Sequence, residues 1–536
     1  MISHLLTRSR PSSRILNASV RRAMSDSQKV ALRALKRKAD SELDGVTPTS
    51  RARTQKRATA PLVPMSYANG AIRITRTPGR TQAKNCVNLR DIIHKDHLEA
   101  ACVYSFFIAE EELYGYLPFS QKPGGVPIYI GRDPSFDVST VQEASILAGV
   151  KFQEKISRKQ LDSLRPILQQ LHSQNYGQNI NTFYAWGPGS CHSKILLLVY
   201  PAFLRIVITS CNMMDIDTEL GDNHWYIHDI PKLRSPSTQS PVGFEADILS
   251  HMEALGTPKA FLDSIVGQYD YSTVKVHLLT SVPGICSGAK AEKHGLLRLR
   301  RIVKQMDLDL PEKDKSEELQ LEVCTASVGN LSAKWLNGFH DCALGKDTLE
   351  THDETRDVPK LKLFYPSMQD VKNADEDARD AASNIGCHTR PWDSAPQEVK
   401  RIFHHYESKD RGRLFHQKFI LACNPRDPTQ LPYYVYVGSA NLSQSAWGAL
   451  EHDKKGNELT SDKKLIKLSN FECGVLIPGH LINDLLEEGT ESWQEGIVPH
   501  VQTAPPYNLP KDKAWNDYRW TRDYRESEAA GSSWTF

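Results

Sequence analysis

Two segments of the chain share one pattern of apolar and polar positions. Each contains two apolar runs of strand length separated by a polar turn, at 195–200 and 204–209 in the first segment and at 419–422 and 433–437 in the second. Short apolar runs bounded by turn residues are typical of buried strands. The repeated pattern therefore predicts two similar β-hairpins, one in each half of the chain.

The two segments also carry the same polar side chains at matching places. A histidine, and a lysine two residues later, precede the first strand, and an asparagine follows the second strand. Because strand side chains alternate between faces, the histidine and the lysine are expected on one face. Two such half-sites facing each other would supply two imidazoles for in-line chemistry and two ammonium groups for a phosphate. The residues concerned are His192, Lys194 and Asn212 in the first copy and His416, Lys418 and Asn441 in the second.

Elsewhere, apolar strand-like runs alternate with helical patterns, which is typical of a layered α/β fold. We expect helices over 91–107 and 295–304 and a strand over 274–279. Since the repeated segments fall in different halves, we predict one domain over 71–270 and a second over 271–536.

Charge is distributed unevenly along the chain. The formal net charge of +2 combines residues 1–60, with 14 Lys and Arg against 4 Asp and Glu, and a remainder with 52 against 60. We predict that residues 1–70 form a disordered basic tail that adds salt-sensitive, non-specific attraction to polyanions. Residues 1–25 are typical of a mitochondrial presequence, and the basic clusters at 36–38 and 51–57 of a nuclear import signal. We therefore expect a nuclear protein with a mitochondrial pool.

The ten cysteines are scattered along the chain without a C-x-x-C pair. This usage predicts reduced, buried thiols rather than a disulfide framework or a zinc module. No run of about 18 apolar residues occurs, so we expect no membrane-spanning segment.

With these motifs the chain resembles the phospholipase D superfamily, in which His-x-Lys is followed by four further residues and an Asp. The Asp places hold Val199 and Cys423 here. In lacking both Asp residues the chain is similar to the tyrosyl-DNA phosphodiesterase family, of the fungal type with an N-terminal extension. The resemblance extends over about residues 84–525. Four further segments carry it, at 327–331, 365–367, 439–448 and 470–475.

The resemblance implies a fold and an activity. The fold would be α/β, with two similar phospholipase D-like α-β-α sandwich domains and one active site shared between them. The activity would be hydrolysis, without a metal or cofactor, of the bond between a DNA 3′ end and a tyrosyl residue of a stalled topoisomerase I peptide, or of other 3′ adducts. His192 would be the nucleophile that forms a phosphohistidine. His416 would act first as general acid and then as general base, and the product would be a 3′-phosphate.

The resemblance also assigns the neighbours of the histidines. Glu472 would orient His416, and Asn223, where the family usually has Gln, would hold His192. A carboxylate beside an imidazole favours the protonated form and suits an acid, whereas an uncharged neighbour suits a nucleophile. Asn212 and Asn441 would assist the lysines with amide donors. The residues expected to contact DNA are Lys194, Lys418, Ser327, Val328, Gly329, Asn330, Ser439 and Ser443.

The implied partner is DNA, single- or double-stranded and read without sequence specificity. We expect a monomer with no membrane association, since one chain already holds both half-sites. Pro188 stands where the family commonly stacks an aromatic side chain on DNA, and Trp186 or Tyr184 would take that part.

Two other functions stay open. One is a phospholipase D-type nuclease or lipid hydrolase, against which the missing Asp residues argue. The other is a non-catalytic DNA-binding scaffold that keeps the fold. The intact pairs of histidines and lysines argue against this second function, because a binding protein needs no paired imidazoles.

Overall fold

The computed structural model describes residues 63–509 and residue 520, except for 110–112, 114, 154, 307, 309, 311–318, 347–355, 428 and 452–464. The predicted presequence and import signal lie outside the described residues. Residues 63–70, which we assigned to the tail, pack on the folded chain. The Tyr67 amide donates to Asp229 Oδ2 at 3.1 Å, and the Arg205 guanidinium lies 4.9 Å from the centre of the Tyr67 ring.

The first half of the chain forms an eight-stranded sheet in the order β2-β1-β8-β7-β6-β3-β4-β5. Strands β3, β4 and β5 are mutually parallel, whereas β6, β7 and β8 pair antiparallel. The first predicted hairpin is confirmed as β6 and β7. The strands are β1 Ala71–Thr75, β2 Cys86–Val87, β3 Ala100–Ser105, β4 Ile128–Arg132, β5 Ile180–Tyr184, β6 Lys194–Val199, β7 Phe203–Thr209 and β8 His224–Pro231.

The predicted helix over 91–107 is wrong. A short helix, α3 (Leu89–Ile92), ends near the start of this range, and the strand β3 (Ala100–Ser105) occupies much of the rest. All six residues of β3 are buried, because the strand lies between β4 and β6 inside the sheet. Pairing with strands distant in sequence has outweighed the local helical pattern.

The first hairpin contains continuous apolar runs because each face of the sheet packs against a different hydrophobic core. Ile195 and Leu197 of β6 belong to one buried cluster, and Leu196 and Leu198 belong to another. A strand covered on both faces needs apolar residues at every position rather than at alternate positions. The first sheet is therefore the middle layer of three.

The second half of the chain forms a seven-stranded sheet in the order β15-β13-β11-β16-β17-β20-β9. The second predicted hairpin is confirmed as β16 and β17, and the predicted strand over 274–279 begins later, at β9. The strands are β9 His277–Ser281, β11 Gln320–Cys324, β13 Leu361–Phe364, β15 Phe403–His404, β16 Phe419–Cys423, β17 Tyr434–Gly438 and β20 Glu472–Pro478. Two small sheets add β10 (Gly284–Ser287), β19 (Leu465–Leu468) and β18 (Ala449–Glu451), and β12 (Ser327–Val328) with β14 (Gly386–Cys387).

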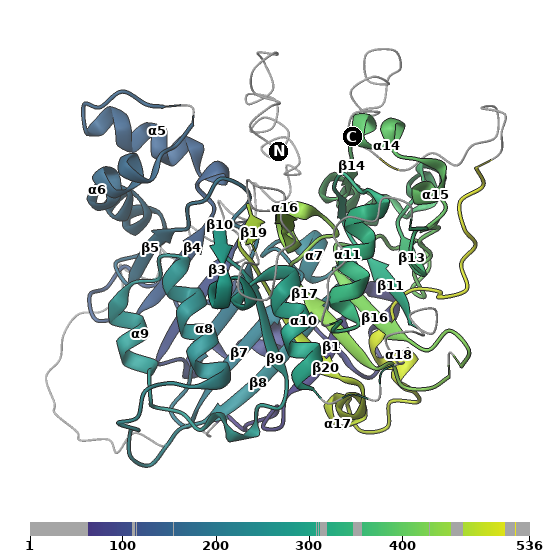
Figure 1. Cartoon of the computed structure of the whole chain (residues 1–536). Coiled ribbons are helices and arrows are strands. Elements are labelled where there is room, and N and C mark those ends of the chain that lie inside the picture. Colours follow the sequence, from purple (N-terminus) through teal and green to yellow (C-terminus); the bar gives the residue numbers. More distant parts are fainter. Residues whose placement is uncertain are drawn as a thin grey trace, which may run out of the picture. The chain divides into compact units, whose positions relative to one another are not determined.

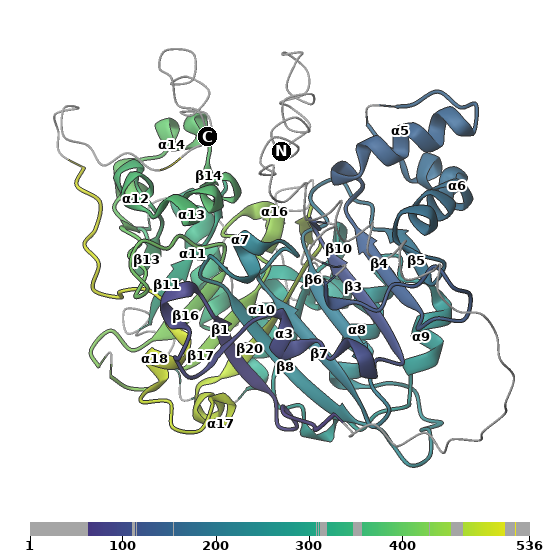
Figure 2. The ribbon, with the colours of Figure 1, turned by 180° about the vertical axis from the view of Figure 1, so that it is seen from behind.

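Helices cover the sheets. Figure 1 shows α8, α9, α10 and α11 across one face, and Figure 2 shows the opposite face with α3, β1 and β8 toward the viewer. The helices are α5 Val138–Leu147, α6 Arg158–Tyr176, α7 Asp215–Thr218, α8 Gly243–Ala254, α9 Lys259–Ile265, α10 Gly295–Gln305, α11 Ala333–Ala343, α12 Met368–Asn373, α13 Glu376–Arg379, α14 Thr389–Ser394, α15 Gln397–Lys400, α16 Gln444–Trp447, α17 Ile482–Leu485 and α18 Trp493–Ile497.

Helix α10 matches the predicted helix over 295–304. Among the described helices, none combines the length and apolar character needed to cross a membrane.

The two sheets meet along the repeated hairpins. Strand β17 contacts β7 and β8, and β20 contacts β7. One buried cluster accordingly contains side chains from both sheets, such as Leu204 and Ile206 from the first and Val435 and Val437 from the second. This junction brings the ends of the two repeats together.

Candidate active site

Each histidine of the repeat is held by the backbone of the other half. The His192 amide donates to the Phe471 carbonyl at 2.8 Å, and the His416 amide donates to the Asp222 carbonyl at 3.1 Å. Cys191, which precedes His192, forms a β-bridge with Phe471. Phe415, which precedes His416, forms a β-bridge with Asp222. The two repeated segments therefore converge on one site.

The two imidazoles face each other in this site. Their ring centroids are 6.2 Å apart, and both side chains are buried. His192 Nδ1 lies 2.9 Å from the Ser439 carbonyl oxygen and 3.0 Å from Glu472 Oε2. His416 Nδ1 lies 2.9 Å from Asp217 Oδ2. Since each Nδ1 faces an acceptor, it carries the hydrogen of the neutral ring, and each Nε2 has the free lone pair.

The predicted neighbours of the histidines are wrong. Glu472 lies beside His192 rather than His416. Asn223 accepts a hydrogen bond from Ser210 Oγ at 2.7 Å and donates to the Asp217 carbonyl at 2.9 Å, so it holds the loop that carries the second carboxylate. The reason is the crossed backbone pairing, because each half delivers its carboxylate to the histidine of the other half.

Asp217 is the site residue that sequence reasoning missed. It lies in the short helix α7 and is fully buried. Its carboxylate accepts hydrogen bonds from the backbone N–H of Asn212 at 2.8 Å and from Asn384 Nδ2 at 3.2 Å. The repeat gave no signal for it, since Ala446 holds the equivalent place after Asn441. The local sequence offers one indication, the closely spaced acidic residues Asp215 and Asp217 shortly after Asn212.

The glutamate is fixed by several donors. Besides facing His192, Glu472 accepts from Ser439 Oγ at 2.6 Å and from Asn470 Nδ2 at 3.0 Å. Ser439 Oγ in turn accepts from the Cys473 amide at 2.9 Å. Ser439, expected to contact DNA, is thus engaged in holding Glu472 and His192.

Both lysines lie fully buried beside their own histidines. Lys194 Nζ donates to the His192 carbonyl at 2.7 Å, and Lys418 Nζ donates to the His416 carbonyl. Burial lowers the pKa of Lys194 to about 7, although Glu472 opposes the shift. Burial and the charge of Lys194 hold the pKa of Lys418 well below its usual range. A bound anion would restore both positive charges.

Burial also keeps the imidazoles neutral in the free protein. It lowers the pKa of His192 to about 4, aided by Lys194 and opposed by Glu472. It lowers the pKa of His416 to about 3, opposed by Asp217. Burial favours the neutral form of the Asp217 carboxyl, yet His416 and Lys418 hold its pKa below the usual range. Both imidazoles are therefore neutral in the free protein at neutral pH, and the Asp217 carboxylate lies beside His416.

The residues predicted to contact the DNA backbone lie next to the second asparagine. Asn441 Oδ1 accepts from Thr325 Oγ1 at 3.1 Å and from the Ser327 amide at 3.0 Å. Gly329 packs so closely on Ser443 that an added Cβ would lie 2.8 Å from Ser443 Cβ. The side chain of Val328 is buried, so only its backbone can reach a ligand, whereas Ser327 and Asn330 are exposed.

One aromatic ring contacts the first histidine, and two further aromatic residues are the predicted substitutes for Pro188. The Phe106 ring lies 4.9 Å from the His192 ring in an edge arrangement, and Lys194 Nζ lies 5.1 Å from the Phe106 centroid. The Tyr184 hydroxyl is already bonded to Asp137. Trp186 keeps 40% of its surface exposed, so of the two predicted substitutes Trp186 is the one with a ring available for stacking.

Buried Asn212 Oδ1 has no hydrogen-bond partner within the described structure. An unpaired buried carbonyl oxygen is costly, and Asn212 is one of the residues predicted to assist at the phosphate. In the described part of the chain, no cluster of three or more His, Cys, Asp and Glu side chains is arranged to hold a metal ion.

Comparisons with known proteins identify relatives of this chain. The "Tyrosyl-DNA phosphodiesterase 1" of Arabidopsis thaliana is 25% identical over 406 residues, which is 65% of this chain and 61% of that protein. The protein of the same name in Drosophila melanogaster is 24% identical over 309 residues, 53% of this chain and 49% of that protein. The chain thus spans about half to three-fifths of the length of these curated relatives.

The crystal structure of the yeast tyrosyl-DNA phosphodiesterase has the same fold. It superimposes with a TM-score of 0.55 at 17% sequence identity, over 83% of this chain and 98% of that chain. The sequence model of the tyrosyl-DNA phosphodiesterase family matches residues 71–515. Because that match covers most of the chain, the protein belongs to the tyrosyl-DNA phosphodiesterase family.

Proposed function

We propose that this protein hydrolyses the phosphodiester between a DNA 3′ end and the tyrosyl residue of a topoisomerase I peptide and leaves a 3′-phosphate. The observation that carries the proposal is the pair of buried imidazoles, 6.2 Å apart, with one lysine beside each. A phosphorus atom between two Nε2 atoms would be open to attack from one side and to proton donation on the other.

The lysines act on the charge of the phosphodiester. Its non-bridging oxygens repel nucleophiles until cations and amide donors neutralise them. Lys194 and Lys418 supply the cations, and Asn212 and Asn441 supply amide donors. Groups of this kind, fixed in a site without bulk water, are typically worth roughly 2.7–4 kcal/mol each to the transition state.

The first step transfers the phosphoryl group to the protein. His192 Nε2 attacks phosphorus, a phosphorus–nitrogen bond forms, and the bond to the tyrosyl oxygen breaks. The negative charge of the bound phosphodiester favours the imidazolium form of His416, which gives its Nε2 proton to the departing oxygen and becomes neutral. Nδ1 of His192 faces Glu472, which stabilises the positive charge that develops on the ring. The assignment of His192 rather than His416 as nucleophile rests on the family resemblance, because the two rings have similar surroundings.

The second step releases the product. His416 Nε2 takes a proton from water, and the resulting hydroxide oxygen attacks phosphorus. The phosphorus–nitrogen bond breaks and His192 is neutral again. Asp217 lies 2.9 Å from His416 Nδ1 and stabilises the imidazolium in both steps.

We further propose that DNA enters along Ser327–Asn330 and Trp186 without base recognition. Exposed hydroxyl, backbone and amide donors suit phosphate oxygens, and an exposed indole suits any base. We propose a monomer, since one chain carries both half-sites, and a nuclear protein with a mitochondrial pool.

A 3′-phosphotyrosyl single-stranded oligonucleotide in EDTA tests the activity. Wild type is expected to release tyrosine and a 3′-phosphate. His192→Ala is expected to be inactive, and His416→Ala to accumulate a covalent DNA adduct. His480→Ala, at an exposed position outside the site, is the matched control. Absence of cleavage by wild type, or cleavage only with added metal, would contradict the proposal.

Assays with other substrates address the other functions. Release of choline from phosphatidylcholine vesicles would indicate a lipid hydrolase. Cleavage within an unmodified oligonucleotide would indicate a general nuclease. DNA binding without turnover of any of these substrates would indicate a scaffold.

A further inference from the structure

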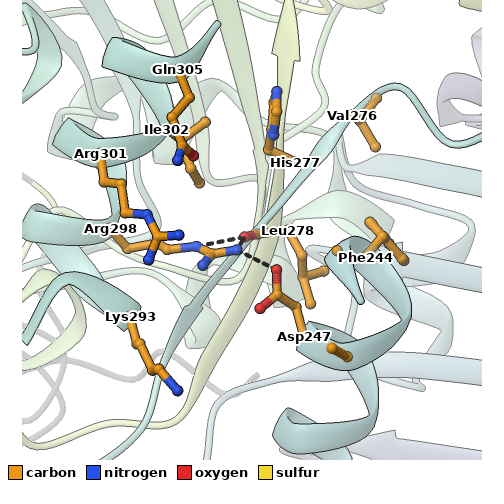
Figure 3. Close-up of a pocket in the computed structure, with 12 residues that line it drawn as sticks. Phe244, Asp247, Val276, His277, Leu278, Lys293, Arg298, Arg301, Ile302 and Gln305 are labelled. Atoms are coloured by element: carbon orange, nitrogen blue, oxygen red, sulfur yellow. Dashed lines mark hydrogen bonds and ion pairs between the residues drawn. The ribbon is translucent and has the colours of Figure 1, made fainter. Parts of the chain in front are cut away.

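A second pocket lies at the junction of the two halves, away from the paired histidines. Its volume is about 290 Å³, and it is lined by the start of α8, by β9 and by α10 (Figure 3). Three cationic side chains line it: Arg298 and Arg301 of α10, and Lys293 just before that helix.

One of the three cations is already neutralised. Arg298 forms an ion pair with Asp247 and donates to the Leu278 carbonyl from Nε at 3.1 Å and from Nη2 at 3.0 Å. Asp247 is the only carboxylate among the residues that line the pocket. Within the described residues, the side chains of Arg301 and Lys293 make no hydrogen bond or ion pair, and Lys293 is exposed. The pocket therefore has an excess of positive charge.

The two arginines are neighbours on one helix face. They are three residues apart on α10, a spacing at which like charges repel. Figure 3 shows both side chains extending toward the same side of the pocket. Because Asp247 already pairs with Arg298, the positive charge left for a bound anion is that of Arg301 and Lys293. Helix α8 begins at the same pocket, and the residue before it provides no side-chain cap for its first amides.

The rest of the lining is apolar. Phe244, Val276 and Ile302 contribute their side chains, of which Val276 and Ile302 are buried. The Phe244 ring is supported by Tyr271, whose ring is stacked at 6.4 Å between centroids. A supported aromatic ring beside unpaired cations suits a ligand that combines a flat ring with a phosphate.

We propose that this pocket binds a nucleoside 5′-monophosphate. Its phosphate would lie between Arg301 and Lys293, and its base would pack on Phe244. The volume of 290 Å³ lies at the lower end of small-ligand sites, which suits one nucleotide and not a duplex. The proposal does not depend on the proposed catalytic activity. The start of α8 is eight residues from His251, the residue that contacts Ser193 beside the catalytic histidine, or about 12 Å along the helix.

Isothermal titration of the full chain with 2′-deoxyadenosine 5′-monophosphate tests this site. The double variant Arg301→Gln/Lys293→Gln is expected to weaken binding by about tenfold or more, since it removes both unpaired cations. Phe244→Leu should weaken nucleotide binding while leaving inorganic phosphate unaffected. The matched control is Arg165→Gln, which alters an arginine on α6 that is 72% exposed.

Two further measurements separate this pocket from the catalytic site. The double variant should keep the wild-type melting temperature and the wild-type rate on the 3′-phosphotyrosyl oligonucleotide. Nucleotide binding should persist in His192→Ala. Equal binding by wild type and the double variant, or no binding by wild type, overturns the proposal. Inorganic phosphate binding as tightly as the nucleotide overturns the assignment of a nucleotide.

Discussion

At the scale of single residues, the site is organised by carboxylates that reach the histidine of the other half. Glu472 faces His192, and Asp217 faces His416. Both imidazoles therefore have an acidic side chain as partner, and the difference between acid and nucleophile cannot come from the presence of such a side chain beside only one ring. It must come from the substrate, whose leaving oxygen lies on one side of phosphorus.

The crossed arrangement predicts different defects for the two carboxylates. Asp217→Asn removes the anion beside His416 and should slow release of the covalent adduct about tenfold or more, the effect of one pKa unit on that histidine. Glu472→Gln should instead slow adduct formation. Rapid-quench single-turnover assays resolve the two steps.

The control for this pair is Asp215→Asn, an exposed acid in the same short helix as Asp217. If Glu472→Gln were the variant that accumulates adduct, the original pairing of Glu472 with His416 would stand and the crossed arrangement would be wrong.

The buried lysines predict that anion binding takes up protons. Burial lowers the pKa of Lys194 to about 7, so most of the lysine is neutral at pH 8. Bound sulfate favours the charged form and raises that pKa, so protons are taken up and affinity falls as pH rises above about 7. Titration calorimetry in two buffers of different ionisation enthalpy measures the uptake.

Lys194→Arg should reduce this uptake, because a guanidinium stays protonated at pH 8. The exposed Lys259→Arg should leave it unchanged. Sulfate binding without proton uptake by wild type at pH 8 would show that the lysines are already charged in the free protein.

At the scale of elements, the position of Ser439 depends on a close approach between β17 and β20. Gly438 and Gly474 lie opposite each other in this antiparallel pair. A Cβ added to Gly474 would lie 2.6 Å from Tyr436 Cζ, and one added to Gly438 would lie 2.7 Å from the Cys473 carbonyl oxygen. Glycine at both places lets β17 end where Ser439 reaches Glu472 and His192.

Gly474→Ala is therefore expected to destabilise the protein by about 1–3 kcal/mol through overpacking against the buried Tyr436 ring. It should also lower the rate of adduct formation, because the Ser439 end of β17 shifts. Urea unfolding and single-turnover kinetics measure the two effects.

Gly338→Ala is the matched control, because a Cβ at that place in α11 would meet nothing within 4 Å. It should stabilise the helix by about 0.5–1 kcal/mol. A loss of stability of equal size in both variants would show that the close approach of the two strands is not the cause.

At the scale of the whole molecule, the junction between the halves contains buried histidines. His251 of α8 contacts Ser193 Oγ at 2.9 Å, and the His224 ring is stacked 4.5 Å from the Phe419 ring of the other sheet. Burial lowers the pKa of His251 to about 3 and that of His224 to about 4. Burial at the junction therefore favours the neutral form of both imidazoles.

This predicts acid lability. The folded pKa of His251 lies below the unfolded value near 6.5, so the unfolded chain binds more protons between the two values. The free energy of unfolding thus falls as pH decreases through about 6.5, by up to about 1.4 kcal/mol per histidine at pH 5.5. Urea titrations at pH 7.5 and 5.5 measure the difference. His251→Gln should reduce that difference by a similar amount, and an unchanged difference would contradict the assigned role of burial.

The sequence by itself determined the repeated hairpins, the α/β class, helix α10 and the chemistry of the paired histidines and lysines. These features are local, because the period of apolar residues and the order of polar residues around a strand do not depend on distant contacts. The strand β3 escaped sequence reasoning, since its six residues become a strand only when β4 and β6 pair with them on either side.

Only the tertiary structure decided which carboxylate serves which histidine. Asp217 and His416 are 199 positions apart in sequence, and Glu472 and His192 are 280 apart. No periodicity links residues at such separations. The partners are set by the β-bridges that cross between the halves, and these depend on how two complete sheets pack together. The chemical groups are therefore written in the local sequence, whereas their pairing is a property of the assembled fold.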